Sequence, residues 1–419
     1  MTGSYYEATA HRAAPTVPLS DSIRSDVCII GAGYTGLMAA LELAERGVRC
    51  VVLEAGLIAG GASGRNGGQL GSGQRRKQRW IETRFGRDRA KHYWRIAEDA
   101  KALVKRRIAD HRIACELKPG ILTVAHRPDL FTELAADAEH LQKEYGYEKI
   151  RVLTKLEVEE QLATRVYHGG VLDMDAAHLH PLNYALGLAR AAQTKGVVIY
   201  EKTRAVRIDP DTGFVEAERG AVEAQRIILG CNGYLGPIAP SIAPYIMPIN
   251  NYIVATEPLG ERAEELIKGD IAVADTRFVI NYYRLSADGR LLFGGGESYS
   301  PHMPKDIASI VRRHLTRVFP RLAGTHLDYA WGGTLAITPT RLPHMGKLGR
   351  RAYFAQGYSG HGIAMAGMAG KLMAEAAFDK SEDFELMAAL NVPPFPGGTV
   401  LRDPLRVAAM LYGKVRDVV

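Results

Sequence analysis

Three glycines near the start of the chain have the spacing of a phosphate-binding turn. Gly31, Gly33 and Gly36 follow the apolar run 26–30 and precede a segment of helical periodicity that ends at Gly47. The first glycine permits the tight bend, the second lets the backbone approach a pyrophosphate, and the third lets the helix pack closely on the strand. Because strand, turn and helix occur in the order that dinucleotide binding requires, the sequence predicts a dinucleotide site here.

An acidic residue stands where the ribose of such a ligand would lie. The second apolar run, 50–53, ends at Glu54, eighteen residues after Gly36. A carboxylate at this place accepts hydrogen bonds from the ribose hydroxyls, and its charge disfavours a 2′-phosphate. Neighbouring residues of the same unit are expected to contact the ligand too: Tyr34, Thr35 and Ala55.

A second glycine-rich segment follows the acid directly. Residues 60–69 read Gly-Gly-Ala-Ser-Gly-Arg-Asn-Gly-Gly-Gln, and a plain nicotinamide domain needs no such loop. Successive backbone amides and an arginine can contact phosphate and flavin, so the segment favours FAD over NAD. A flexible surface loop is the alternative. The cofactor contacts predicted here are Ser63, Arg65, Asn66, Gly67, Gly68 and Gln69.

A third glycine-rich turn, at 356–363, leads into an apolar helix over 364–378. The positive end of that helix can stabilise negative charge on the edge of a reduced flavin. Close packing of a small-residue helix on a sheet is the alternative, and one helix can do both. The predicted cofactor contacts are Gly357, Ser359, Gly360, His361, Gly362 and Ile363, with Val206, Asn232 and Gly233 from earlier segments.

Apolar periodicity predicts the elements that must hold these residues. Helices are expected over 37–46, 93–110, 129–145, 182–195 and 364–378. Buried strands are expected over 26–30, 50–53, 120–125 and 197–200, with a strand pair at 205–208 and 226–229. Alternating segments at 252–256, 278–285 and 291–294 predict antiparallel strands with one solvated face.

The predicted fold class is α/β, or α+β overall, with a Rossmann-like dinucleotide domain and a second, mostly antiparallel substrate domain. At 419 residues the chain exceeds the usual size of a single domain. The expected division is an N-terminal extension 1–24, a discontinuous FAD-binding domain 25–90, 150–240 and 330–380, a substrate domain 91–149 and 241–329, and a C-terminal extension 381–419.

Composition excludes several classes of protein. A chain with 47% hydrophobic and 24% charged residues is an ordinary globular protein, not a disordered one. The net charge of +7 is spread widely, and the densest basic run, 74–79, is short, so nucleic-acid binding is not expected. The basic surface suits an anionic small substrate, and solvated surface charge is the alternative.

The cysteines and the N-terminus indicate a cytoplasmic protein. Cys28, Cys50, Cys115 and Cys231 are widely separated, which fits neither a disulfide framework nor a zinc site. The first residues lack a signal-peptide pattern. The uncharged stretch 227–256 contains four prolines, so membrane insertion is not expected.

Together these motifs resemble the glycine/D-amino acid oxidase superfamily, which also contains the sarcosine oxidases. The likeness is carried by 26–55, 61–69, 227–233 and 357–363. Within the superfamily the chain is most similar to the gamma-glutamylputrescine oxidase group of FAD-dependent amine oxidases, through stretches such as 282–296 and 393–398. The resemblance implies that a carbon–nitrogen bond is oxidised to an imine, which water hydrolyses to an aldehyde, and that oxygen is reduced to hydrogen peroxide.

The resemblance also implies how the flavin is held. Sarcosine oxidases bind their flavin through a cysteine in the C-terminal flavin-facing region, but no cysteine follows Cys231 in this chain. Noncovalent FAD is therefore expected.

Two residues are the candidates for catalysis. Hydride loss needs an unprotonated substrate nitrogen, and His361, among glycines that place it near a ligand, can accept a proton. A hydrogen bond from His361 to the backbone at the helix start is the alternative. Tyr282 and Tyr283 occupy one predicted strand, so only one of them can face the cavity; Tyr283 is the catalytic candidate and Tyr282 the substrate contact.

An anionic substrate such as a gamma-glutamyl amine needs a cationic partner, for which arginine offers a bidentate fork. Arg284, Arg341 and Arg75 are the candidates, in that order. His178 and His180 lie near two aspartates, but their spacing matches no metal-binding template, so no metal is expected.

Other functions share this fold. A D-amino acid or N-methyl amino acid oxidase has the same flavin, and a dehydrogenase would pass electrons to a carrier other than oxygen. A flavin-binding assembly component without turnover is the third alternative. The expected partners are a small amine substrate and O2.

Overall fold

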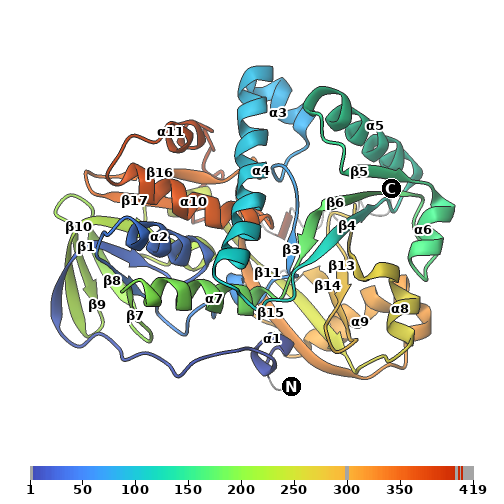
Figure 1. Cartoon of the computed structure of the whole chain (residues 1–419), viewed down its shortest axis with the longest axis horizontal. Helices are drawn as coiled ribbons and strands as arrows, with labels where there is room; N and C mark the ends of the chain where they lie inside the picture. Colours follow the sequence, from blue (N-terminus) through green and yellow to red (C-terminus); the bar gives the residue numbers. More distant parts are fainter. Residues whose placement is uncertain (1–2, 298–301, 402–403, 406, 409–419) are drawn as a thin grey trace.

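A computed structural model of the chain describes residues 3–297, 302–401, 404–405 and 407–408. Figure 1 shows two β-sheets side by side, the first at the left and the second at the right, with helices packed on both. The predicted α/β architecture with a second, mostly antiparallel sheet is confirmed.

The first sheet carries the predicted dinucleotide unit. Its strand order is β16-β17-β10-β1-β2-β7, and neighbours from β17 to β7 run parallel. Strands that are buried on both faces need continuous apolar runs, which explains the sequence of β1 and β2. The strands of this sheet are β1 (Ser22–Ile30), β2 (Cys50–Leu53), β7 (Val198–Tyr200), β8 (Ala205–Asp209), β9 (Phe214–Ala217), β10 (Gly220–Leu229), β16 (His344–Leu348) and β17 (Ala352–Gln356).

The strands predicted as a pair at 205–208 and 226–229 do not pair. The short strand β9 lies between them and pairs with both β8 and β10. Four residues are too few for alternation to reveal a strand, so the sequence interpretation missed it.

Four helices pack against this sheet and form one core with it: α2 (Tyr34–Glu45), α4 (Arg87–Asp110), α7 (Pro181–Thr194) and α10 (Gly362–Ala376). Helices α2 and α10 approach closely, because a Cβ atom at Gly370 would lie 2.2 Å from the Thr35 carbonyl oxygen. The small-residue helix was expected to pack closely on a sheet, and this close approach is to the helix α2.

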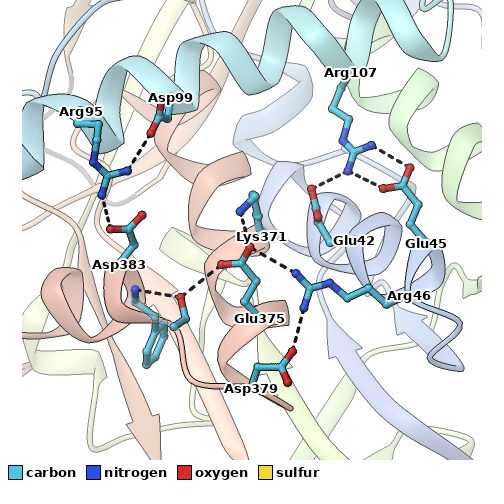
Figure 2. A network of polar contacts seen from close by, with 12 residues as sticks. Glu42, Glu45, Arg46, Arg95, Asp99, Arg107, Lys371, Glu375, Asp379 and Asp383 are labelled. Atoms are coloured by element: carbon cyan, nitrogen blue, oxygen red, sulfur yellow. Dashed lines mark hydrogen bonds and ion pairs between the residues drawn. The ribbon is translucent and has the colours of Figure 1, made fainter.

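Ion pairs hold the outer parts of these helices together (Figure 2). Arg107 of α4 donates to Glu42 and Glu45 of α2 at 2.6 and 2.7 Å, and both Arg107 and Glu42 are nearly buried. The other pairs in the network are Arg46 with Glu375 and Asp379, Arg95 with Asp99 and Asp383, and Lys371 with Glu375. The last helix, α11 (Glu382–Ala388), is thereby joined to α4.

The second sheet is mostly antiparallel, as predicted. Its order is β15-β11-β14-β13-β12-β4-β6-β3, with β5 beside β6. The strands are β3 (Gln69–Leu70), β4 (Lys118–Val124), β5 (Ile150–Leu153), β6 (Gly170–His178), β11 (Met247–Thr256), β12 (Ala272–Asp275), β13 (Tyr282–Leu285), β14 (Leu291–Glu297) and β15 (Leu327–Ile337).

Helices cover this sheet and complete its separate core. The amphipathic helix α9 (Ile307–Val318) packs Val311 and Leu315 against strand residues such as Phe293. The remaining helices are α1 (Tyr5–Ala8), α3 (Gln78–Phe85), α5 (Pro128–Tyr145), α6 (Lys155–Gln161) and α8 (Arg262–Leu266).

The predicted domain boundaries need correction. Strands β5, β6 and β15 belong to the second sheet, although 150–240 and 330–380 were assigned to the FAD-binding part. Helix α4 lies in the first core, although 91–149 was assigned to the substrate part. Periodicity identifies an element but not the sheet that it joins, because the partner comes from distant sequence.

The predicted N-terminal extension is part of the fold. Tyr5 and Tyr6 in α1 are 3% and 0% exposed and pack in the first core. Of the two predicted extensions, residues 1–2, 402–403, 406 and 409–419 lie outside the described residues. Within the described ranges no helix combines the length and apolar character that a membrane span needs.

A buried histidine makes stability depend on pH. His180 is fully buried, its Nδ1 accepts from the Asn183 amide at the start of α7, and its Nε2 lies 3.0 Å from Thr9 Oγ1. Burial, with help from the positive charge of Arg284, lowers the pKa of His180 to about 3. Below pH 6.5 the His180 imidazole is protonated in the unfolded chain but stays neutral in the folded chain. The free energy of unfolding therefore decreases as the pH falls from 6.5 toward 3.

We expect His180→Asn to narrow the gap in unfolding free energy between pH 7 and pH 5 by about 2 kcal/mol. Asparagine keeps a helix-capping acceptor but does not titrate. Urea unfolding of both proteins at the two pH values measures the gap. His92→Asn, at an exposed position, is the control. If the difference in unfolding free energy between pH 7 and pH 5 is the same in His180→Asn as in the unaltered protein, His180 is not its source.

Candidate active site

A cavity of about 1680 Å³ lies between the first and second sheets, with walls from both. A cavity of this size holds an extended ligand together with a small molecule beside it. The predicted residues on its walls are Gly31, Gly33, Tyr34, Thr35, Glu54, Ala55, Ser63, Arg65, Asn66, Gly67, Gln69, Arg75, Val206, Asn232, Tyr282, Arg341, Ser359, Gly360, His361, Gly362 and Ile363. Six predicted residues lie behind the wall: Gly36, Gly68, Gly233, Gly357, Tyr283 and Arg284.

The N-terminal turn has the geometry that its glycines predict. Gly31 has a φ of +102°, which L side chains rarely adopt, and a Cβ atom at Gly36 would lie 1.9 Å from the Gly31 carbonyl oxygen. A Cβ atom at Gly33 would lie 2.8 Å from Ser63 Oγ, which itself accepts from the Tyr34 amide. Helix α2 therefore begins at the cavity without a side-chain cap, with Ser63 of the second glycine loop directly against it.

Glu54 is fixed at the end of β2. Its Oε2 accepts from the Ala32 amide and its Oε1 from the Gly56 amide, both at 2.8 Å. Burial raises the pKa of the carboxyl group, and these two amides oppose that shift by stabilising the anion. Each oxygen keeps a further lone pair for a ribose hydroxyl.

Two residues of the second glycine loop shape the loop itself. Asn66 Nδ2 donates to the Ala62 and Ser63 carbonyls at 3.0 and 2.9 Å, and Asn66 Oδ1 accepts from the Gly68 amide. Arg65 donates from Nε to the Gly60 carbonyl at 3.0 Å and from Nη1 to that of Gly332 at 3.2 Å. The loop is thus held in one shape, and its backbone is presented to the cavity.

The structure overturns the first choice of substrate arginine. Arg284 is 2% exposed, and it donates from Nε to the Gly67 carbonyl at 3.1 Å, from Nη1 to that of Leu285 at 2.9 Å and from Nη2 to that of Leu179 at 3.0 Å. All three nitrogens are engaged behind the glycine loop. Arg284 is therefore a support of that loop and lies away from the space that a substrate would fill.

We expect Arg284→Met to weaken FAD binding about tenfold, because the buried Gly67 and Leu179 carbonyls lose their donors. Turnover of anionic and neutral amines should fall by the same factor. Fluorescence titration of the apoprotein with FAD measures the binding, and Arg106→Met on the exposed side of α4 is the control. A loss confined to anionic amines would restore Arg284 to the substrate site.

The two adjacent tyrosines face opposite sides of β13, as predicted, and only Tyr282 faces the cavity. Tyr283 is 1% exposed and packs in the second core, stacked on Phe293. Tyr283 is therefore withdrawn as a catalytic residue. Tyr282 lines the cavity instead, and its hydroxyl donates to Asn251 Oδ1.

The ring of Tyr282 has room only because two neighbours are glycines. A Cβ atom at Gly67 would lie 2.6 Å from the ring, and one at Gly294 would lie 2.1 Å from it. The ring thus sits between the glycine loop and strand β14. Its partner Asn251 was not predicted, because nothing in the uncharged stretch 227–256 singles it out.

His361 stands at the start of α10 and lines the cavity. Burial and the nearby charge of Arg75 lower its pKa to about 4, although a hydrogen bond with the Gly73 backbone opposes the shift. Its Nε2 is buried without a hydrogen-bond partner. Since the Gly73 bond then falls on Nδ1, the ring is neutral at pH 7 and Nε2 is an unpaired acceptor.

The residues present fit the expected dinucleotide. Buried polar atoms are nearly always hydrogen-bonded, so the unpaired His361 Nε2 indicates a ligand. Helices α2 and α10 both begin at the cavity without side-chain caps, and such ends bind anionic groups. The α2 end and Glu54 suit the pyrophosphate and ribose, and the α10 end suits the flavin.

The wall residues missed from the sequence include Arg76 and Trp80. Arg76 donates from Nε to the Thr340 carbonyl at 2.8 Å, and its guanidinium lies 4.9 Å from the centre of the Trp80 ring. Arg76 lies in the basic run 74–79 and Trp80 directly follows it, but neither gave an indication of a cavity. Among the described residues, no group of three or more His, Cys, Asp or Glu side chains is placed to hold a metal ion.

Comparison with known proteins gives a consistent result. The family profile DAO, described as FAD dependent oxidoreductase, matches residues 26–376. The chain is 38% identical to the gamma-glutamylputrescine oxidoreductase of Escherichia coli (strain K12), over 99% of this chain and 98% of that protein. It is 39% identical to the probable oxidoreductase OrdL of Rhizobium meliloti, over 99% and 97%.

Solved structures share the fold. The glycine oxidase of Bacillus cereus superposes with a TM-score of 0.72 at 20% identity, over 88% of this chain and 99% of that one. The L-proline dehydrogenase of P. horikoshii superposes with a TM-score of 0.70 at 20% identity, over 86% and 94%.

Proposed function

This chain belongs to the DAO family of FAD-dependent oxidoreductases, and from that premise we propose that it oxidises a carbon–nitrogen bond of a gamma-glutamylated amine such as gamma-glutamylputrescine. The product is an imine, which water hydrolyses to an aldehyde, and O2 is reduced to H2O2. The full-length likeness to an oxidoreductase named for that amine supports the substrate class. The observation that carries the chemistry is the cavity wall at His361, where the uncapped end of α10 and an unpaired buried acceptor meet.

Bound FAD supplies the hydride acceptor for this reaction. The chain must supply a neutral amine, since a protonated nitrogen has no lone pair to stabilise the cation left on carbon. Enclosure in the cavity favours the neutral form by desolvation. With a pKa of about 4, His361 is too weak a base to keep an ammonium proton at pH 7, but its Nε2 can accept a hydrogen bond from the substrate N–H.

The same wall stabilises negative charge. The amides at the start of α10 and the positive end of that helix face the cavity beside His361. Arg75 adds a cation there, because its Nε donates to the Ser359 carbonyl at 3.1 Å. These groups favour the electron-rich form of any ring bound against them.

Two alternatives within the family differ in substrate or acceptor. A D-amino acid or N-methyl amino acid oxidase would use the same wall, and a dehydrogenase would deliver electrons to another carrier. Solved structures of similar fold include proteins named as an oxidase and as a dehydrogenase, the glycine oxidase and the L-proline dehydrogenase. We place the reaction in the cytoplasm, in keeping with the four free thiols.

A substrate panel tests the proposal. Gamma-glutamylputrescine, putrescine, sarcosine, glycine and D-alanine are compared by kcat/KM, with oxygen consumption and peroxide release followed together. We expect gamma-glutamylputrescine to exceed the others by at least about 100-fold, with one peroxide formed per oxygen consumed. A higher kcat/KM for sarcosine or D-alanine would contradict the proposed substrate and favour an N-methyl amino acid or D-amino acid oxidase. Turnover with an artificial electron acceptor and none with oxygen would make the protein a dehydrogenase.

A further inference from the structure

The main cavity continues into a smaller hollow, which we call the annex. It has a volume of about 230 Å³ and is enclosed by the loop 72–79, helix α5 and strands β4 to β6. Its walls are apolar where they are formed by Trp94, Leu134 and Val171, and many of its residues also line the main cavity. The annex is therefore an extension of the candidate active site.

One side of the annex carries positive charge without a counterion. Within the described part of the chain, neither Arg75 nor Arg76 forms an ion pair; Arg75 is exposed on the cavity wall and Arg76 is half-buried. Desolvation lowers the pKa of both, and for Arg75 the neighbouring charge of Arg76 adds to the shift. A carboxylate placed here would relieve an unfavourable concentration of charge.

Arg76 is held in a pose suited to such a carboxylate. Its Nε is engaged by the Thr340 carbonyl, and the plane of the guanidinium is supported by Trp80. The two terminal nitrogens therefore stay available with little loss of side-chain entropy on binding. Arg341, one residue beyond Thr340, lines the main cavity.

Two acids of α5 lie beside the loop 72–79, and one of them, Asp137, lines the annex. Glu133 and Asp137 of α5 lie 2.6 and 2.8 Å from Lys77 Nζ. Asp137 Oδ1 also lies 4.0 Å from Arg79 Nε. Asp137 lines the annex together with Arg75 and Arg76, and its carboxylate oxygens keep lone pairs for a further donor beside Lys77.

We propose that the annex binds the α-amino-acid head of the substrate, with Arg76 contacting its carboxylate and Asp137 its ammonium group. This inference rests on the proposed function and gives it a specificity-determining subsite. Arg75 connects the annex to the reacting end, since it adjoins Arg76 and contacts Ser359, two residues before His361. A long zwitterionic amine can therefore occupy the annex with its head and reach His361 with its terminal nitrogen.

Three amides of butylamine, which lack the terminal amine of putrescine, test the subsite by calorimetric binding to the holoenzyme under anaerobic conditions. Gamma-glutamylbutylamine carries both the carboxylate and the ammonium group of the amino-acid head. Glutarylbutylamine lacks the ammonium group, and gamma-aminobutyrylbutylamine lacks the carboxylate. We expect Arg76→Met to weaken the first two about 50-fold and the third less than about twofold. Asp137→Asn should weaken the first and third about tenfold and leave the second unchanged.

Arg84→Met, which removes an equal charge from the exposed side of α3, is the control and should leave all three affinities unchanged. Equal losses for all three amides in Arg76→Met, no loss, or no measurable binding to the unaltered protein would overturn the annex proposal. The proposed function is tested separately, by bleaching of the flavin with gamma-glutamylputrescine. If the three amides bind as expected but gamma-glutamylputrescine does not bleach the flavin, only the proposed function is wrong. If the flavin is bleached but the affinities do not follow the expected pattern, only the annex proposal is wrong.

Discussion

Gly33→Val is expected to yield a folded protein that has lost its FAD. Even a Cβ atom at this position would lie 2.8 Å from Ser63 Oγ, and the two valine methyl groups would extend into the approach of the pyrophosphate. The glycine lies at the start of α2, so the substitution also displaces the loop that packs there. We expect the dissociation constant for FAD to rise by at least about 100-fold, which corresponds to a loss of about 2.7 kcal/mol.

The measurement is the ratio of flavin to protein after purification, followed by titration of the apoprotein with FAD. Gly324→Val is the matched control, because a Cβ atom there would meet no atom within 4 Å. Circular dichroism separates loss of FAD from loss of the fold. If folded Gly33→Val keeps a full complement of FAD, the N-terminal turn is not the pyrophosphate site.

His361→Leu should lower the rate constant for flavin reduction about 100-fold while FAD stays bound. Leucine fills similar space but cannot accept a hydrogen bond, so the substrate N–H loses the unpaired Nε2 acceptor at the start of α10. His361→Asn, with an amide oxygen as acceptor, should recover part of the rate. Anaerobic stopped-flow mixing with the amine measures all three proteins.

The pH dependence separates two roles for the same ring. Because the pKa of His361 is lowered to about 4, its charge does not change between pH 6 and pH 9. The rise in rate over that range should therefore reflect deprotonation of the amine, and His361→Leu should lower the curve without moving it. A shift of the midpoint in His361→Leu would identify His361 as a titrating base.

The dinucleotide unit was predictable because its requirements are local. The spacing of Gly31, Gly33 and Gly36 is set by one turn, and the observed φ of Gly31 and the contact at Gly36 follow from it. Glu54 is likewise fixed by the length of one helix and one strand. Alternation in β13 was also local, so the opposite orientation of Tyr282 and Tyr283 was correctly expected.

The remaining site residues depend on which distant segments meet. Whether Tyr282 or Tyr283 faced the cavity was set by the placement of α9 on the other face, which no local pattern reveals. Arg284 had the expected charge, but its carbonyl partners at Gly67 and Leu179 come from two distant loops. The place of Arg76 on the cavity wall became apparent only when its contacts with Trp80 and the Thr340 carbonyl were known.

The most direct test of the account is an anaerobic titration of the holoenzyme with gamma-glutamylputrescine, followed by the visible flavin band. We expect the band to bleach completely with one equivalent of amine and the corresponding aldehyde to be recovered in equal amount. A flavin that stays oxidised in excess gamma-glutamylputrescine, yet bleaches with sarcosine or a D-amino acid, would contradict the assigned substrate.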